Sequence, residues 1–193
     1  MLLSRVGGAL LITGTVAASV WALIFGSPAG PDEARAGSWL VNALMILIGA
    51  GAAVVATTAA RPMDGRLTRA GLGIAAIGLT GITLGQTMVV IPAGSNELAS
   101  TPWVLLVGGG FLAAVIGALV VGVSLARSRD LGARLVGLAL LAGPLSLPLA
   151  TAISLPLHVD AGAVVLVGLG VSVVGVAGVG VLALGVGRLG SAA

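Results

Sequence analysis

The sequence predicts an all-α integral membrane protein in which six transmembrane helices form three tandem helical hairpins. Three observations support this prediction. Of the 193 residues, 58% are hydrophobic and only 8% are charged, whereas about a quarter of the residues in an ordinary soluble domain are charged. Six long runs contain no charged residue, and a group of residues recurs at a spacing of 64 positions. Residues 1–193 are therefore expected to form a single transmembrane domain.

Each uncharged run is long enough to cross a bilayer. A hydrocarbon core of about 30 Å needs about 20 helical residues. Helices are favoured over barrel strands because the runs are continuously apolar, and because lipid requires each backbone N–H and C=O to be paired within its own segment. In order, the runs are residues 6–25, 40–60, 70–91, 103–126, 135–155 and 161–187.

Three of these runs have distinctive features. The first could be a cleaved signal peptide that starts at Arg5, but its apolar stretch exceeds the usual signal core, and it has a counterpart inside the chain. The fifth contains Pro144 and Pro148, which each remove a backbone donor, so a kink is expected. The sixth has glycines on more than one face and could contact neighbours on two sides.

The 64-residue spacing divides the chain into three similar parts. Residues 28–39, read as the connection after the first helix, contain a Pro-Ala-Gly sequence, a glutamate and a tryptophan that recur within residues 92–103. A second set recurs at the same spacing and continues one residue late in the last third: Arg5, Gly7 and Gly14; Arg69, Gly71 and Gly78; Arg134 and Gly143. Hairpin repeats of approximately residues 1–64, 65–129 and 130–193 follow. Because each repeat crosses the membrane twice, the repeats are parallel, and a pseudo-threefold axis along the membrane normal is expected.

The charged residues predict the orientation. All basic residues are arginines, and only Arg35 lies outside the two termini and the connections after the second and fourth runs, which six crossings place on one side. By the positive-inside rule this side is cytoplasmic, so both termini lie inside the cell. Trp21, Trp39 and Trp103 lie at the other side of the membrane, at the outer ends of the predicted helices, where indole rings favour the head-group level.

Arginine without lysine or tyrosine is typical of a GC-rich bacterial genome, so we expect a multi-pass protein of a bacterial cell (plasma or inner) membrane. The short basic loops are expected to contact the lipid bilayer and not nucleic acid.

Small residues at helical spacing predict seams for close helix packing, because small side chains let helix backbones approach each other in lipid. These seams could serve packing within the chain or contact with a partner membrane protein or a second copy. The seam residues are Gly49 and Ala53 in the second run, Gly71, Gly78, Gly81 and Gly85 in the third, Gly110 and Gly117 in the fourth, and Gly168, Ser172 and Gly175 in the sixth.

The sequence offers no group with recognisable reaction chemistry. No charged residue lies at mid-membrane depth, where it would indicate an ion path or proton relay. The chain has no cysteine, and its single histidine, His158, lies beside Asp160 in a short loop, which is too few ligands for zinc. We therefore expect no enzyme activity, no catalytic residue, no metal site and no cofactor.

The most polar positions inside the runs lie about one helical turn below the outer surface. They could line a pocket for a neutral polar solute, or they could hydrogen-bond between helices, where such bonds average about 0.6 kcal/mol. These residues are Asn42, Gln86, Thr87, Thr151 and Ser154.

Two functions fit the sequence. The first is a non-catalytic structural, anchoring or accessory subunit of a membrane protein assembly, which the glycine seams and the lack of buried charge favour. The alternative is a transporter or substrate-binding membrane subunit for a small neutral or lipophilic solute, held in a cavity along the pseudo-threefold axis.

Overall fold

The computed structural model describes residues 2–25, 31–58, 65–90, 102–157 and 161–185. Within these ranges the protein is all-helical and has no strand, as predicted. The helices are α1 (Leu2–Phe25), α2 (Pro31–Thr58), α3 (Arg66–Val90), α4 (Pro102–Ala126), α5 (Leu131–Leu157) and α6 (Ala161–Leu184). Side chains are described for most of each helix, but not for residues 21–25, 31–39, 41, 86–90, 102–104, 147, 151, 153–157 and 161.

Helices α1 to α5 begin before their uncharged runs, whereas α6 ends at Leu184, short of the run predicted to reach residue 187. The largest difference is at α2, which begins at Pro31, so residues 31–39 are helical and the reading of residues 28–39 as a connection is wrong for that part. Proline is well suited to the first position of a helix, because the N–H that it lacks would have no partner there. Pro102 begins α4 in the same way. Charge excludes a residue from the hydrocarbon core but does not prevent it from being helical.

Local chemistry also fixes the ends of α5 and α6. The Asp130 carboxylate accepts a hydrogen bond from the backbone N–H of Ala133 at 3.0 Å, which caps the start of α5. Beyond the end of α6, Gly185 adopts a φ of 73°, a conformation that glycine reaches without the penalty of a Cβ. Between these ends, α5 is helical throughout, through Pro144 and Pro148.

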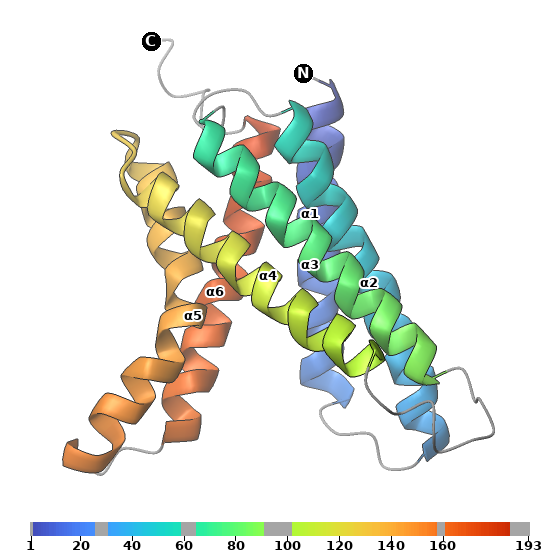
Figure 1. Ribbon diagram of the computed structural model, residues 1–193. Helices are drawn as coiled ribbons and strands as arrows, with labels where there is room; N and C mark the ends of the chain where they lie inside the picture. The colour runs from blue at the N-terminus through green and yellow to red at the C-terminus, as the bar shows by residue number, and fades with distance from the viewer. Residues whose placement is uncertain (1, 26–30, 59–64, 91–101, 158–160, 186–193) are drawn as a thin grey trace.

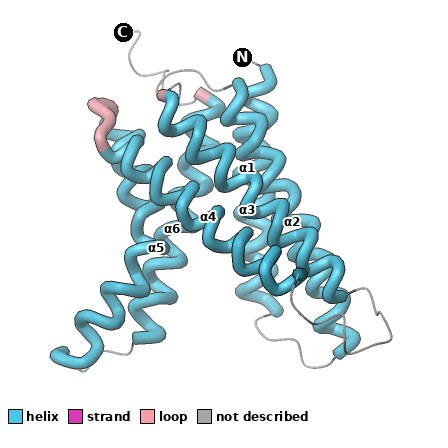
Figure 2. The backbone as a smooth tube through the Cα atoms, viewed as in Figure 1, coloured by secondary structure: helices cyan, strands magenta, loops and turns pink. Residues whose placement is uncertain are grey.

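The helices form a closed ring in chain order. Each packs mainly against the helices before and after it, and α1 packs against α6 to complete the ring. Figures 1 and 2 show that the start of α1 and the end of α6 lie at the same end of the bundle, and that α4 crosses from α3 to α5. At the opposite end, α5 and α6 diverge from α1, α2 and α3. The helix α6 therefore has neighbours on two sides, as its glycine pattern suggested.

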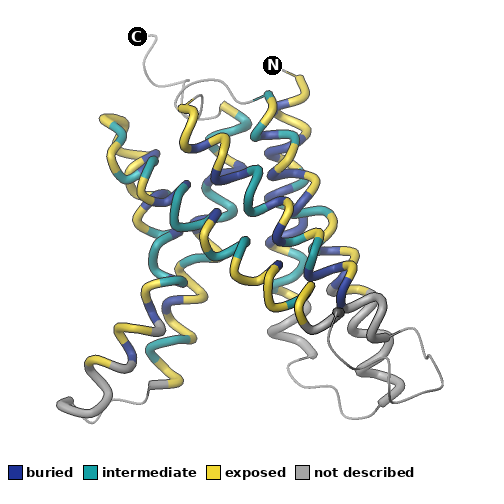
Figure 3. The backbone as a smooth tube through the Cα atoms, viewed as in Figure 1, coloured by how far each residue is buried: buried dark blue, intermediate teal, exposed yellow. Residues whose placement is uncertain are grey.

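The buried core lies toward the end that holds the start of α1 (Figure 3). Its members come from all six helices, which converge there. They are Leu11, Ala52, Val55, Leu72, Ala76, Val121, Leu125, Ala133, Leu140 and Val179. A hydrogen bond from Ser4 Oγ to the carbonyl oxygen of Ala183, 3.0 Å long, joins α1 to α6 at this end.

The outer surface of the bundle is apolar. Phe111 of α4 is 60% exposed, Leu166 of α6 is 70% exposed, and other large hydrophobic side chains are exposed on every helix. Soluble monomers rarely expose contiguous apolar surface on this scale. Four segments of the described chain are long and apolar enough to cross a membrane, namely Leu2–Val20, Arg66–Gly85, Leu105–Ala126 and Gly162–Leu184. These features are those of a helical membrane protein.

Glycines bring neighbouring helices into backbone contact. A Cβ added at Gly110 of α4 would lie 2.6 Å from the carbonyl oxygen of Gly78 and 2.7 Å from the backbone nitrogen of Ile82, both in α3. One at Gly117 would lie 2.6 Å from the carbonyl oxygen of Gly71. Real Cβ atoms do not approach backbone this closely, so α3 and α4 can pack in this way only while these positions are glycine.

Candidate functional site

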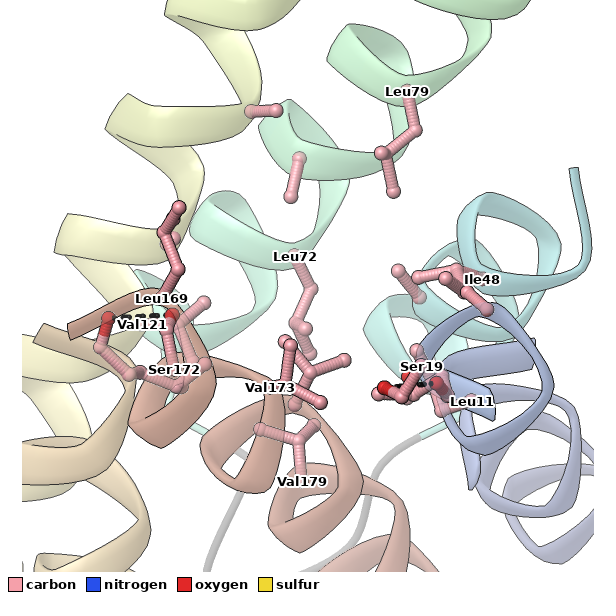
Figure 4. A pocket seen from close by; sticks show the side chains of 18 residues that line it. Leu11, Ser19, Ile48, Leu72, Leu79, Val121, Leu169, Ser172, Val173 and Val179 are labelled. Carbon is pink, nitrogen blue, oxygen red and sulfur yellow. Dashed lines mark hydrogen bonds between the residues drawn. The ribbon is translucent and has the colours of Figure 1, made fainter. Parts of the chain in front are cut away.

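A cavity of about 500 Å³ lies inside the ring, at about the middle of the helices. Every helix supplies at least one of its lining residues, so the cavity exists only because the ring closes. Its size lies within the range of about 300–1,000 Å³ that is usual for small-molecule sites. Figure 4 shows side chains from α1, α2, α3, α4 and α6 around it.

The floor of the cavity is the buried core itself. Six residues belong both to the core and to the lining, and each comes from a different helix: Leu11, Ala52, Leu72, Val121, Leu140 and Val179. They close the cavity toward the end that holds the start of α1. On α6, Leu169 and Val173 line the cavity and are still exposed, so the cavity has an open side at α6.

The walls are built from small and branched apolar residues. Alanines line it from four helices, at Ala18, Ala52, Ala75, Ala114 and Ala118. Since alanine neither fills the space between helices nor allows the backbone contact that glycine allows, these positions leave room inside the ring. The described lining residues include no charged side chain.

One polar group of the cavity lies between α5 and α6. Ser172 Oγ donates a hydrogen bond to the carbonyl oxygen of Leu140 at 3.3 Å, and both residues line the cavity. In a regular helix the N–H of residue 144 would reach that carbonyl, but Pro144 has none. The serine of α6 therefore satisfies the acceptor that the proline of α5 leaves open. Figure 4 shows the hydrogen bond of Ser172 as a dashed line.

The second polar group lies on α1. Ser19 Oγ donates to the backbone carbonyl of Thr15 at 2.8 Å, and both residues line the cavity. The Thr15 side chain is only 4% exposed, and its Oγ1 has no hydrogen-bond partner. The cavity thus has hydroxyl groups on α1 and on α6, within an otherwise apolar lining.

Of the five residues of the predicted polar pocket, only Asn42 has a described side chain. Asn42 lies in α2 and is buried, but it is not among the described residues that line the cavity. Gln86 and Thr87 are helical in α3, and Thr151 and Ser154 are helical in α5, but their side chains lie outside the described residues. Whether these residues meet in a pocket stays a prediction. His158 and Asp160 also lie outside the described residues, and so do the side chains of the three tryptophans.

The seam residues have different surroundings. In α3, Gly71, Gly78 and Gly81 face α4, and Gly110 and Gly117 face back toward α3. In α6, Gly168 and Gly175 face α5, and Ser172 bonds to α5 as described above. Gly49 makes only ordinary contact with Leu79 of α3, and Gly85 is buried. Ala53 differs, because its side chain is exposed and lies outside any seam; α2 packs on α1 through Gly51 instead.

The sequence allowed a cavity along the pseudo-threefold axis as one alternative, but it did not predict which residues line that cavity, and it missed several close contacts between helices. Gly8 of α1 meets Gly180 of α6 where the ring closes, and Gly122 of α4 meets Gly137 of α5. Isolated glycines give no sign of which helix they face until the order of the helices around the ring is known. Thr15 gave no signal either, because a threonine in an apolar helix usually bonds to its own backbone.

Comparisons with models of protein families, with curated proteins and with solved structures found no match for this chain. Among the described residues no group of three or more His, Cys, Asp or Glu side chains could hold a metal ion. The features of the molecule that bear on its function are therefore the ring, its seams and its cavity.

Proposed function

We propose that all six helices cross the membrane, as three hairpin repeats, α1–α2, α3–α4 and α5–α6. The helices have 24 to 28 residues each, which is about 36 to 42 Å of helix, more than the roughly 30 Å of the hydrocarbon core. In α2 and α5 the described apolar stretches are shorter, Asn42–Thr58 and Leu131–Ser146. These two helices belong to the same ring as the other four, which supports a position at the same depth.

The repeat is supported by equivalent contacts in the three hairpins. Gly14, Gly78 and Gly143 are the repeat counterparts in α1, α3 and α5. A Cβ added at any of them would meet the second helix of its own hairpin, at Ile48, Ala114 or Ser172 respectively. The contacts within hairpins are also more extensive than those between them.

We further propose that the end of the bundle with the start of α1 faces the cytoplasm. Arg5, Arg66, Arg69, Arg127, Arg129 and Arg134 belong to helix ends and a connection at that end. The test is to introduce single cysteines into this cysteine-free chain, Ser95→Cys and Ser128→Cys, and to treat intact cells with an impermeant thiol reagent. Only the cysteine at position 95 should be labelled, and the reverse pattern would overturn the orientation.

Within this frame, we propose that the protein is a non-catalytic membrane subunit that binds a small, neutral, lipophilic solute in the central cavity. The observation that supports this function is the cavity itself, because all six helices line it with apolar side chains. A cavity of about 150 Å³ holds one benzene ring, so 500 Å³ has room for roughly three such rings. Transport would be a further step, beginning from the open side at α6.

The test uses adamantane as a compact hydrocarbon probe. Purified protein in lipid nanodiscs should show a saturable rise in melting temperature with adamantane, because a ligand that binds only the folded state stabilises it. Ala118→Phe would fill the cavity from α4 and should abolish the rise. Ala53→Phe, on the exposed face of α2, is the matched control and should retain it. No saturable rise in the natural protein with either adamantane or its 1-hydroxy derivative would refute the proposed function.

A second candidate is an anchoring or accessory subunit of a membrane assembly, and one face of α4 favours it. Gly108 and Gly109 face outward, with nothing within 4 Å of an added Cβ, beside the exposed Phe111 and Leu112. A helix of a partner protein or of a second copy could approach closely there. Gly108→Leu should then remove a co-purifying chain in mild detergent, whereas Gly170→Leu, an equally open position on α6, should not. Purification as a lone monomer would count against this candidate.

A further inference from the structure

The Thr15 hydroxyl is an exception among the buried threonines. Thr68 Oγ1 shares a hydrogen bond with Ser124 Oγ at 2.8 Å, and Thr83 Oγ1 donates to the carbonyl oxygen of Leu79 at 2.9 Å. Thr15 is buried to the same degree, but its Oγ1 has no partner. Leaving a buried hydroxyl unpaired costs free energy. The oxygen itself has almost no accessible surface, but Thr15 lines the cavity, so rotation about its Cα–Cβ bond would bring the hydroxyl to the cavity wall, where a molecule that enters can reach it.

The two serine hydroxyls of the cavity already donate hydrogen bonds within the protein. Ser19 Oγ donates to the Thr15 carbonyl and Ser172 Oγ donates to the Leu140 carbonyl. A serine oxygen that donates its proton keeps lone pairs that can accept. Among the described lining residues, Ser19 and Ser172 therefore offer acceptors, and Thr15 offers both a donor and an acceptor.

The chemistry of the lining limits the class of ligand further. No charged side chain is among the described lining residues, and an unpaired ion in an apolar site is strongly disfavoured. A carbonyl compound would use only the Thr15 donor. An alcohol can accept from Thr15 and also donate its own proton to Thr15 or to a serine oxygen.

We propose that the ligand is an uncharged lipophilic alcohol whose hydroxyl group binds to Thr15 Oγ1, with its hydrocarbon part against the apolar floor. This assignment rests on the proposed solute-binding function and adds the chemical class of the solute and the residue that recognises its polar group. The floor of Leu11, Leu72 and Val179 faces the hydrocarbon part.

The test compares three rigid probes of similar shape, adamantane, 1-adamantanol and 1-adamantanecarboxylate, at equal concentration in the nanodisc bilayer. The natural protein should bind 1-adamantanol about 3- to 10-fold more tightly than adamantane, the gain of roughly one hydrogen bond, and should not bind the carboxylate. Thr15→Val keeps the shape of the side chain and should bind both neutral probes equally. Thr13→Val, an exposed position on the same helix, should behave as the natural protein does.

The outcomes separate the two proposals. If adamantane binds saturably and Ala118→Phe blocks it, but the alcohol has no advantage or keeps its advantage in Thr15→Val, the role of Thr15 is refuted and solute binding stands. If neither neutral probe binds the natural protein, both proposals are refuted. If Thr15→Val does not fold, Thr15→Ser and Thr15→Ala replace it, and only the serine variant should keep the preference for the alcohol.

Discussion

The contact between α3 and α4 and the lining of the central cavity both contain small residues, with opposite results. Along α3 and α4, Gly71, Gly78, Gly110 and Gly117 bring two backbones into contact. Around the cavity of about 500 Å³, alanines of four helices are part of the lining. A missing Cβ lets two helices approach, whereas a methyl group holds them apart without filling the space beyond it. Between a glycine of the helix contact and an alanine of the lining, the difference is one carbon atom.

The largest effect is expected where a methyl group is added to the glycine contact. Gly110→Ala would place Cβ against the backbone of Gly78 and Ile82, and backbone cannot move aside as a flexible side chain can. We expect a loss of about 2–4 kcal/mol in the free energy of unfolding, comparable with severe overpacking. The measurement is unfolding by titration with SDS.

Gly108→Ala is the matched control for this change, because it adds the same methyl group to the same helix with nothing within 4 Å. It should be neutral or slightly stabilising, since alanine has the higher helix propensity. Equal losses in both variants would mean that α3 and α4 do not meet at Gly110.

The converse change fills the cavity. Ala18→Phe on α1 and Ala118→Phe on α4 add large apolar side chains to the lining, and either should lower the binding of adamantane more than 10-fold by occupying its space. Neither should cost as much stability as Gly110→Ala, because the space is already present. A titration of each variant with the probe, followed by melting temperature, measures the effect.

A smaller effect is expected at the hydrogen bond between Ser172 and the Leu140 carbonyl. Ser172→Ala leaves that acceptor unpaired and should cost about 1 kcal/mol. In a Pro144→Ala background the new backbone N–H of residue 144 can reach the carbonyl, so Ser172→Ala should then cost little. A double-mutant cycle that gives the same cost in both backgrounds would contradict the link between proline and serine.

The smallest effect concerns the free energy of unfolding of the protein without a bound solute. Thr15→Val removes a buried hydroxyl without a partner and should raise the free energy of unfolding by about 0.5–1 kcal/mol. Thr83→Val removes a hydroxyl that is bonded to the Leu79 carbonyl and should lower it by about 0.5 kcal/mol. The two variants should therefore change the free energy of unfolding in opposite directions. A lower free energy of unfolding in both would show that Thr15 has a partner in the folded protein.

Much of the helical content could be predicted from the sequence, because hydropathy and the absence of charge act locally along the chain. The ends of the helices are harder to predict from the sequence. Residues 31–39 contain charges, so the sequence predicts a connection there, yet they are helical. The charge pattern indicates where the lipid ends and not where the helix ends. The capping of α5 by the Asp130 carboxylate, which accepts from the backbone N–H of Ala133, could likewise be recognised only in the structure.

By itself, the sequence determined that this chain forms long apolar helices with glycine-lined faces, because an apolar run in lipid must pair its own backbone. Only the tertiary structure decided which faces meet and where space remains. Gly8 contacts Gly180 although 172 positions separate them, and Thr15 lies on a cavity wall because the ring closes between α1 and α6. A pattern along one helix specifies a smooth face, but the partner of that face, or the gap beside it, depends on helices that are distant in the sequence.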